Sequence, residues 1–424
     1  MIIIESINFV DLIGGGAVSR IVFAWELGAN YGYISQFLPF AHALKARGHE
    51  VVMVVRELHH AARMMTDSSI PVMQAPVWLP VIQGLPEPPL NYAEILLRYG
   101  YHDASGLSGV VSAWRAMFML FQADLLIASH APTALLAARS MGLTAAPLGT
   151  GFSILPRLNP TPNLRYWASV PYERLTGSDE IVLKAANAVL GACGAKPMKA
   201  LSDLFDTPES FLCTLPELDH YPQRNGATYW GAVYETEMGH EAAWPDLETS
   251  AGSNVKVNRI LVYLEPRHRD FMALLEIISA QGHHALICAP GIADNLRQKL
   301  SSNKVRIFAQ PIKFAGLLAE CNLVICHGGH GTTAGMLQAG IPLLMLPNHL
   351  EQFLLATRVR ALGAGELVDA ESPPPDLSAL LLKLLNTVDY RNNAQKFAAK
   401  YRQYTREQQL AKITARIEEM ATEK

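Results

Sequence analysis

Residues 326–347 read CHGGHGTTAGMLQAGIPLLMLP, and their pattern indicates the fold class of the protein. It places glycines, histidines and two threonines between two apolar runs. The run 323–326 before it is typical of a buried strand, and the spacing predicts a helix that begins near Thr332. A second apolar run, 341–347, predicts a return to the sheet. Strand, glycine turn, helix and strand in this order indicate a parallel α/β sheet.

The turn combines groups that suit an anionic ligand. They are His327, Gly328, Gly329, Gly331, Thr332 and Thr333. Glycines let the backbone approach a ligand closely. The start of a helix offers unpaired N–H groups and a partial positive charge, and hydroxyls can cap the helix or donate to phosphate oxygens. We therefore expect a phosphate or diphosphate here, with an imidazole donor from His327.

The strand–helix rhythm occurs twice along the 424 residues, and near-continuous apolar strands indicate parallel sheets covered on both faces. Because 424 residues exceed what one core usually holds, we expect two domains. The predicted divisions are a doubly wound domain over 1–240, a polar linker over 241–258, a second doubly wound domain over 259–389, and a terminal helix over 390–424 that packs across both.

Composition excludes several classes of protein. A net charge of -3 gives no electrostatic basis for binding nucleic acid or an anionic membrane surface. Five cysteines without a CxxC pair indicate reduced thiols and a cytoplasmic protein. We predict no transmembrane segment, while a peripheral membrane contact stays open. Residues 1–19 are expected to be a loosely ordered lead and not a signal peptide.

The 14 histidines raise the question of a metal site. HGGH and RELHH supply imidazoles, but no HExxH motif or paired carboxylates accompany them. We therefore expect neither a metal nor a bound cofactor. The irregular interval 85–114 is rich in Pro, Tyr and Gly, and it either lines a cleft or forms a surface excursion. Apolar and aromatic side chains of the first half suit a lipid-like ligand or a core equally well: Trp78, Tyr92, Tyr99, Trp114, Met117 and Phe118.

Several segments together resemble one family. HGGHGTT…AGIPLLMLPNHLEQ resembles the donor signature of the UDP-glycosyltransferase-like family, including its bacterial antibiotic, lipid and glycan branch. WELGANYGYISQFLPFAHALKARGHEVVMVV, ADLLIASHAPTALLAARSMGLTAAPLGTGF and FLCTLPELDHYP resemble three segments of its N-terminal domain. The resemblance implies the GT-B fold, in which two Rossmann-like domains face a central cleft. It implies that the N-terminal domain binds the acceptor and that the C-terminal domain binds the nucleotide-sugar. It also implies that a nucleotide-sugar is the donor and that no metal is needed.

The resemblance carries roles to matching residues. It implies that His327 and the following turn (Gly328, Gly329, Gly331, Thr332 and Thr333) hold the donor diphosphate. Glu351 and Gln352 match the pair that binds sugar hydroxyls, and a carboxylate beside an amide offers the acceptors and donors this needs. Main chain near Gln310–Ile312 matches the segment that reads the base, so Gln310 and Ile312 are expected beside it.

Three positions depart from the family pattern. Tyr33 stands where relatives carry the His that acts as general base, and Ser129 stands where an Asp orients it. A phenol with a pKa of about 10 is a poor base near neutrality. Gly335 replaces a Glu that binds ribose, which leaves UDP and dTDP both open. The base candidates in this chain are Tyr33, Asp103 with its neighbour His102, and His130, unless the reaction needs no protein base.

The resemblance thus implies a glycosyltransferase that moves a sugar from a UDP- or dTDP-type donor to a small or lipid-like acceptor, with inversion. The missing dyad leaves open a second hypothesis, a catalytically decayed protein that binds nucleotide-sugars or glycans. A third, a sugar-nucleotide epimerase, needs several carboxylates around the sugar, and only Glu351 is placed for this by sequence.

Overall fold

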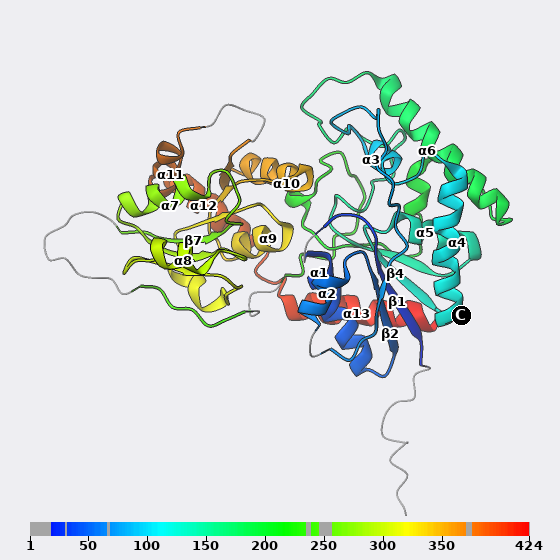
Figure 1. Cartoon of the computed structure of the whole chain (residues 1–424), viewed down its shortest axis with the longest axis horizontal. Helices are drawn as coiled ribbons and strands as arrows, with labels where there is room; N and C mark the ends of the chain where they lie inside the picture. The colour runs from blue at the N-terminus through cyan, green and yellow to red at the C-terminus, as the bar shows by residue number, and fades with distance from the viewer. Residues whose placement is uncertain are drawn as a thin grey trace, which may run out of the picture.

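Two parallel sheets form two lobes that lie side by side (Figure 1). The computed structural model describes residues 18–29, 32–65, 68–234, 239–245, 257–369 and 375–423. The strand orders are β3-β2-β1-β4-β5-β6 and β12-β11-β10-β7-β8-β9, and the six strands in each sheet are parallel. The expected fold of two doubly wound domains is confirmed.

The N-terminal domain alternates strands with covering helices. Its strands are β1 (Arg20–Trp25), β2 (Glu50–Val55), β3 (Val72–Gln74), β4 (Leu125–Ser129), β5 (Ala145–Gly149) and β6 (Phe211–Leu212). Its helices are α1 (Gly32–Ala46), α2 (Leu58–Met64), α3 (Tyr92–Leu97), α4 (Ala104–Phe121), α5 (Pro132–Met141) and α6 (Tyr172–Ala192), with 3-10 turns η2 (Leu201–Phe205) and η3 (Pro216–Leu218).

The C-terminal domain repeats the pattern. Its strands are β7 (Arg259–Tyr263), β8 (His284–Cys288), β9 (Val305–Phe308), β10 (Leu323–Cys326), β11 (Leu343–Met345) and β12 (Gly365–Leu367). Its helices are α7 (Phe271–Ala280), α8 (Asp294–Leu300), α9 (His330–Gln338), α10 (Leu350–Ala361), α11 (Leu377–Asn386) and α12 (Val388–Lys400), with the 3-10 turn η4 (Ala315–Glu320). The last helix is α13 (Arg406–Thr422).

Each sheet is buried on both faces, which explains why its strands read as continuous apolar runs. In β1 the side chains of Val22 and Ala24 join one hydrophobic core, while Ile21, Phe23 and Trp25 join the core on the opposite face. The second sheet divides its strand residues between two cores in the same way. Both rows of each strand must therefore be apolar, and no polar face remains.

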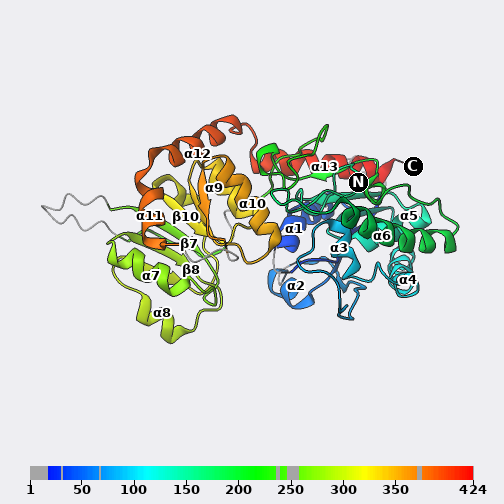
Figure 2. The ribbon, with the colours of Figure 1, turned by 90° about the horizontal axis from the view of Figure 1, so that it is seen from above.

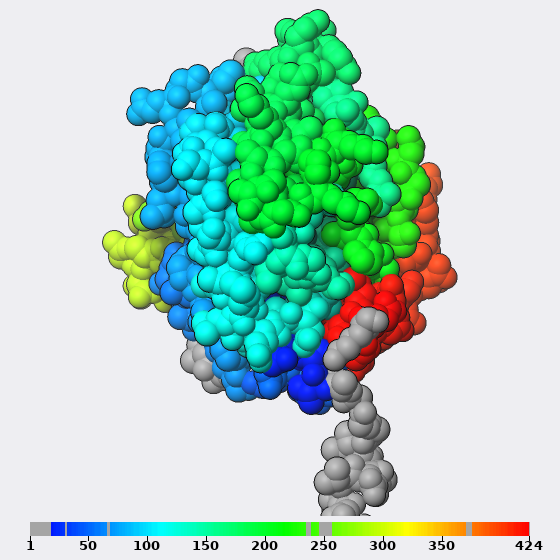
Figure 3. All heavy atoms as spheres, turned by 90° about the vertical axis from the view of Figure 1, so that its right-hand side faces the viewer, coloured from blue at the N-terminus to red at the C-terminus, as the bar shows by residue number. Residues whose placement is uncertain are grey.

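The end of the chain ties the domains together. The predicted terminal helix over 390–424 is two helices, because the turn at residues 401–405 separates α12 from α13. α12 packs against α9, whereas α13 packs against α1 of the other domain. The Ser19 hydroxyl donates to the Ala421 carbonyl at 3.1 Å, and His49 Nε2 lies 3.0 Å from Glu418. Viewed from the N-terminal domain, α13 lies at the lower right of that surface (Figure 3).

Other expectations need smaller corrections. The helix after the glycine turn begins at His330 and not near Thr332, because the turn is shorter than expected. α4 is long and apolar enough to cross a membrane by length and composition, but it packs against α5 and α6 of the N-terminal domain. Most of the predicted lead 1–19 and of the linker 241–258 lies outside the described residues.

Candidate functional site

The glycine turn links the carboxyl end of β10 to the first turn of α9. Gly328 has φ +83°, a left-handed conformation that side chains disfavour, and a Cβ there would lie 3.3 Å from the Gln352 carbonyl. The turn therefore lies against the start of α10, which carries Glu351 and Gln352. Two helix starts and one strand end meet at this point, the position where open α/β sheets bind ligands.

Both ring nitrogens of His327 are engaged in the turn. Nε2 accepts the Glu265 amide at 2.9 Å, so the proton lies on Nδ1, which donates to the Leu346 carbonyl at 3.2 Å. Burial lowers the pKa of His327, so the ring is neutral near pH 7. In this arrangement His327 has no free N–H to offer a diphosphate. The expectation that it donates directly therefore needs a condition, namely that Nε2 exchanges the Glu265 amide for a ligand and gains a proton.

The two threonines of the motif lie differently. Thr332 is half-buried at the start of α9, whereas Thr333 is fully buried. The Thr333 amide donates to the Gly329 carbonyl at 2.9 Å as part of the helix. Because its side chain is enclosed in the domain, the Thr333 hydroxyl does not face a ligand in this arrangement, which corrects the expectation for the pair. Thr332, with Gly329 and Gly331 beside it, remains at the open end of the helix.

Glu351 points across the boundary between the domains, where Figure 2 shows α1 and α10 facing each other. Its Oε1 accepts from the Thr150 hydroxyl at 3.3 Å, and its Oε2 accepts from the Tyr33 hydroxyl at 3.4 Å. Burial raises the pKa of Glu351 to about 7, although both hydrogen bonds act in the opposite direction. The carboxylate thus exchanges its proton near neutrality. Thr150, which follows β5, was not identified from the sequence, where nothing distinguishes it from other threonines.

Tyr33 and His130, two of the predicted base candidates, are in contact. The Tyr33 hydroxyl lies 3.0 Å from His130 Nδ1, and the Tyr33 ring stacks on Trp25 at 5.4 Å. Gly28 makes room for that ring, because a Cβ at Gly28 would lie 2.5 Å from it. Burial raises the pKa of Tyr33 well above its usual value and lowers that of His130 to about 3. Tyr33 is therefore a hydrogen-bond donor and His130 a neutral ring, and neither is a strong base.

Asp103, the other base candidate, lies at a helix start. Its Oδ1 accepts the Ser105 amide at 2.9 Å, which caps α4. His102 packs edge-on against Trp78 with ring centroids 5.6 Å apart. The structure thus gives Asp103 a structural contact, and its role as a base remains a prediction. Ser129, at the position of the family's Asp, donates to Gln36 at 3.4 Å.

Further contacts hold the two domains against each other. His330 Nε2 lies 2.7 Å from the Thr214 hydroxyl, and the Tyr166 hydroxyl lies 3.0 Å from that of Thr357. Glu217 bonds to Lys400 and Tyr401. These pairs join residues far apart in sequence. They fix the glycine turn and Glu351 opposite the carboxyl ends of the N-terminal strands.

The segment expected to read the base lies beside His240, in the stretch of chain that leads from the N-terminal to the C-terminal domain. His240 bonds the backbone of Pro311 and Lys313, each at 2.9 Å, and its ring contacts the Gln310 side chain. Ile312 is buried, whereas Gln310 is exposed. A groove of about 550 Å³ along β9 is bordered by His240, Phe308 and Gln310. Another of about 740 Å³ lies at the opposite end of α9, away from the glycine turn.

The ring of Tyr234, which precedes the C-terminal domain in the chain, covers Gly335. A Cβ at Gly335 would lie 2.9 Å from the Tyr234 ring, and Tyr234 also lies near Gly331. The ring thus occupies the face of α9 from which relatives extend a ribose-binding Glu. Gly335 departs from the family pattern by sequence, and in the structure it packs against Tyr234.

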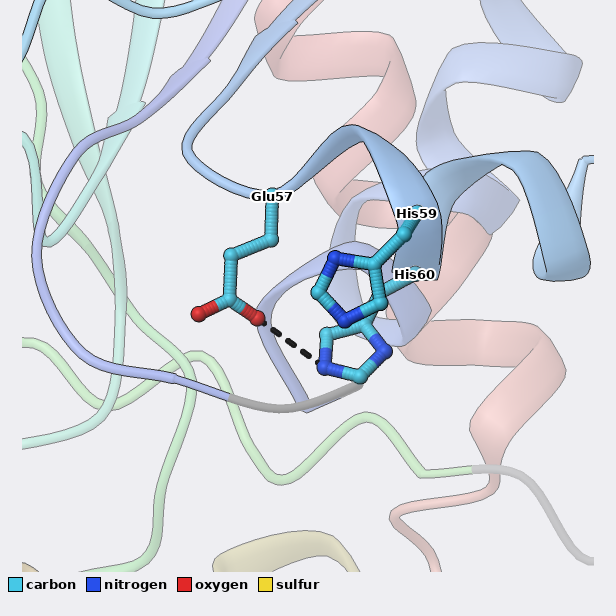
Figure 4. Close-up of side chains that lie close together, drawn as sticks. All are labelled: Glu57, His59 and His60. Carbon is cyan, nitrogen blue, oxygen red and sulfur yellow. Dashed lines mark ion pairs between the residues drawn. The ribbon is translucent and has the colours of Figure 1, made fainter.

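Glu57, His59 and His60 offer ligand atoms that all lie within 4.8 Å of one another (Figure 4). They follow the carboxyl end of β2, and His60 Nε2 lies 2.9 Å from Glu57 Oε2. The motif RELHH predicts the two imidazoles, and the structure places the carboxylate of Glu57 beside them. An ion pair between residues three apart on one helix accounts for the contact between Glu57 and His60. The site of the glycine turn does not include this group.

Comparisons with known proteins agree with this geometry. Residues 281–417 match the family described as erythromycin biosynthesis protein CIII-like, C-terminal domain. The L-demethylnoviosyl transferase of Streptomyces niveus is 27% identical over 346 residues, covering 79% of this chain and 81% of that protein. The glycosyltransferase VinC, solved in complex with dTDP, has a TM-score of 0.63 and 18% identity, and covers 94% of this chain and 99% of VinC. The chain is thus similar to glycosyltransferases in sequence and shares the fold of a solved one.

Further proteins extend the comparison. An uncharacterized glycosyltransferase of Mycobacterium tuberculosis is 30% identical over 133 residues, which cover 31% of each chain. The spinosyn rhamnosyltransferase SpnG, complexed with thymidine diphosphate, has a TM-score of 0.60 at 18% identity and covers 94% of this chain and 99% of SpnG. At such identities the structural likeness establishes the GT-B fold alone, which the sequence resemblance predicted.

Proposed function

We propose that this glycosyltransferase moves a sugar from a nucleoside diphosphate sugar to the hydroxyl of a small or lipid-like acceptor, with inversion at the anomeric carbon. The observation that carries the proposal is the glycine turn at the carboxyl end of β10, with the start of α9 facing the N-terminal domain. Helix starts of this kind bind diphosphates through backbone N–H groups.

Different residues contact the diphosphate, the base and the sugar of the donor. Gly328, Gly329, Gly331 and Thr332 surround the diphosphate, which is the leaving group. His327 joins them once its Nε2 carries a proton, and the residues at Gln310 and Ile312 lie beside the base. Glu351 and Gln352 are the sugar-binding pair. Stabilisation of the departing diphosphate by fixed dipoles lowers the barrier without a metal.

The proposed nucleotide is of the dTDP type, with UDP as the alternative. Tyr234 covers the position of the ribose-binding Glu, and deoxyribose lacks one of the hydroxyls that such a Glu would bind. Two solved relatives, VinC and SpnG, are complexes with this nucleotide. The acceptor is proposed to be apolar, because Leu79 and Val81 beside Trp78 are 82% and 86% exposed. Tyr92, Trp114 and Phe118 are buried core residues and take no part in this surface.

A panel of UDP-, dTDP- and GDP-sugars tested by thermal unfolding checks the donor, since a ligand that binds only the folded protein raises its apparent stability. We expect the dTDP- or UDP-sugar to raise Tm in the wild type and to have a much smaller effect in His327→Ala. Release of nucleoside diphosphate with an acceptor panel then tests transfer. Binding without release for any acceptor would favour the second hypothesis, a binding protein without catalysis.

A further inference from the structure

We propose that Glu351 is the general base of the transfer and that it is supplied by the domain opposite the acceptor. The assignment rests on the proposed glycosyl transfer and goes beyond it, since the matching residue of the family is expected only to bind sugar hydroxyls. It answers the question that the sequence left open, because neither member of the usual dyad is present in the N-terminal domain.

The Glu351 carboxylate lies at the position where the base is needed. Tyr33 marks that position, because it stands in place of the family's His, and Glu351 Oε2 lies 3.4 Å from its hydroxyl. Thr150, at the carboxyl end of β5, holds Oε1 at 3.3 Å. Both contacts are made to the domain that is expected to bind the acceptor. The two oxygens contact different residues of that domain, and Oε2 is the one beside Tyr33, at the position of the family's base.

Tyr33 is suited to orient this carboxylate and not to replace it. Enclosure of the phenol raises its pKa well above the usual value, so Tyr33 keeps its proton and donates to Glu351. His130 Nδ1, 3.0 Å from the same hydroxyl, then donates to the Tyr33 oxygen. The hydrogen bonds are thus donated from His130 to Tyr33 and from Tyr33 to Glu351. Tyr33 and His130 are thus positioning residues.

The chemistry of Glu351 fits the role. Desolvation raises the pKa of Glu351 to about 7, and general bases act best when their pKa lies near the working pH. Asp103, in contrast, has one oxygen bonded to the amide of Ser105 at the start of α4. His130 is nine-tenths or more buried, and its pKa is lowered to about 3, which makes it too weak an acceptor.

The step can be written without any further reactant. Glu351 Oε2 takes the proton of the acceptor hydroxyl as the acceptor oxygen forms a bond to the anomeric carbon. The bond between that carbon and the diphosphate oxygen breaks, and its electron pair leaves with the nucleoside diphosphate into the glycine turn. Glu351 afterwards returns its proton to solvent. Catalysis in this scheme needs both domains in contact, because the base and the acceptor lie on different domains.

Two phenols of similar size distinguish a base from a sugar-binding residue. 2-Chloro-4-nitrophenol is ionised at neutral pH and needs no base, whereas 4-methylphenol keeps its proton. Glu351→Gln preserves shape and hydrogen bonding, so we expect it to lose about 10²–10⁴-fold in kcat/KM toward 4-methylphenol and far less toward the nitrophenol. Formate added to Glu351→Ala should restore part of the rate toward 4-methylphenol only.

Asp103→Asn is the matched comparison, and any loss there should be equal for the two phenols. Equal losses in Glu351→Gln, or a selective loss in Asp103→Asn, would overturn the assignment. Retention of the thermal shift with dTDP, which lacks the sugar that Glu351 is proposed to bind, shows that each variant folds and binds the nucleotide. Failure of the wild type to bind nucleotide-sugars or to transfer at all would instead contradict the proposed function itself.

Discussion

The Tyr33 hydroxyl of α1 donates to the Glu351 carboxylate of α10 at 3.4 Å, across a sequence separation of 318 residues. This contact joins the start of α1 to the start of α10. The hydrogen bond lowers the pKa of this carboxyl group, while burial raises it by more, so that the pKa lies at about 7 with both effects present. The proton affinity of the donor-side carboxylate is therefore set by the acceptor-side domain.

Tyr33→Phe tests this relationship. Phenylalanine keeps the ring stacked on Trp25 but removes the donor to Glu351. Because that hydrogen bond favours the ionised form, its loss should raise the pKa of Glu351 above about 7. The rising limb of kcat/KM against pH should then move to higher pH, while the donor KM changes little. Thr150→Val, which removes the other donor, should move it the same way. A lower rate with an unmoved limb would contradict the prediction.

His327 should couple donor binding to pH. Its pKa is lowered by burial, and its Nδ1 proton is committed to Leu346, so a phosphate contact at Nε2 requires proton uptake. A group whose pKa rises on binding strengthens binding as the pH falls. Calorimetry with dTDP-glucose, whose esterified diphosphate does not titrate near neutrality, should show tighter binding from mildly alkaline to mildly acidic pH. The dependence should weaken in His327→Asn, and a flat wild-type profile would argue against the contact.

Gly328→Ala should disturb the turn where Gly329→Ala does not. Gly328 has φ +83° and its added Cβ would lie 3.3 Å from the Gln352 carbonyl, whereas a Cβ at Gly329 meets nothing within 4 Å. A left-handed residue with a side chain costs about 1–2 kcal/mol. Thermal unfolding should show a lower Tm for Gly328→Ala and little change for Gly329→Ala. Equal Tm values would mean that the turn relaxes freely.

Gly335→Ala should destabilise the protein through Tyr234. The new methyl group would lie 2.9 Å from the Tyr234 ring, and overpacking of this kind costs about 1–3 kcal/mol in the free energy of unfolding. Tyr234→Ala should reduce that cost in the double variant, which a double-mutant cycle measures. Gly177→Ala is the control, since Gly177 lies within α6 with open space around it and should gain about 1 kcal/mol. Additive effects at Gly335 and Tyr234 would rule out the contact.

Much of the fold was predictable because its signals are local. The apolar strand β10 and the glycines after it specify strand, turn and helix within some 20 residues of sequence, the span of one such unit. α9 begins at His330, two residues before the predicted start at Thr332, because the start of a helix depends on the turn that precedes it. The break between α12 and α13 was missed because helical propensity continues through it and only packing on two different domains separates them.

The sequence by itself determined two doubly wound domains, the position of the glycine turn and the absence of the family's dyad, because each depends on neighbouring residues. Only the tertiary structure decided which groups meet across the boundary: Tyr33 with Glu351 and His130, Thr150 with Glu351, and Tyr234 with Gly335. It also decided that Thr333 faces the core and that His327 has both nitrogens engaged. Hydrogen bonds and desolvation act through space, so a pKa near 7 at Glu351 follows from how the domains pack and not from the letters around it.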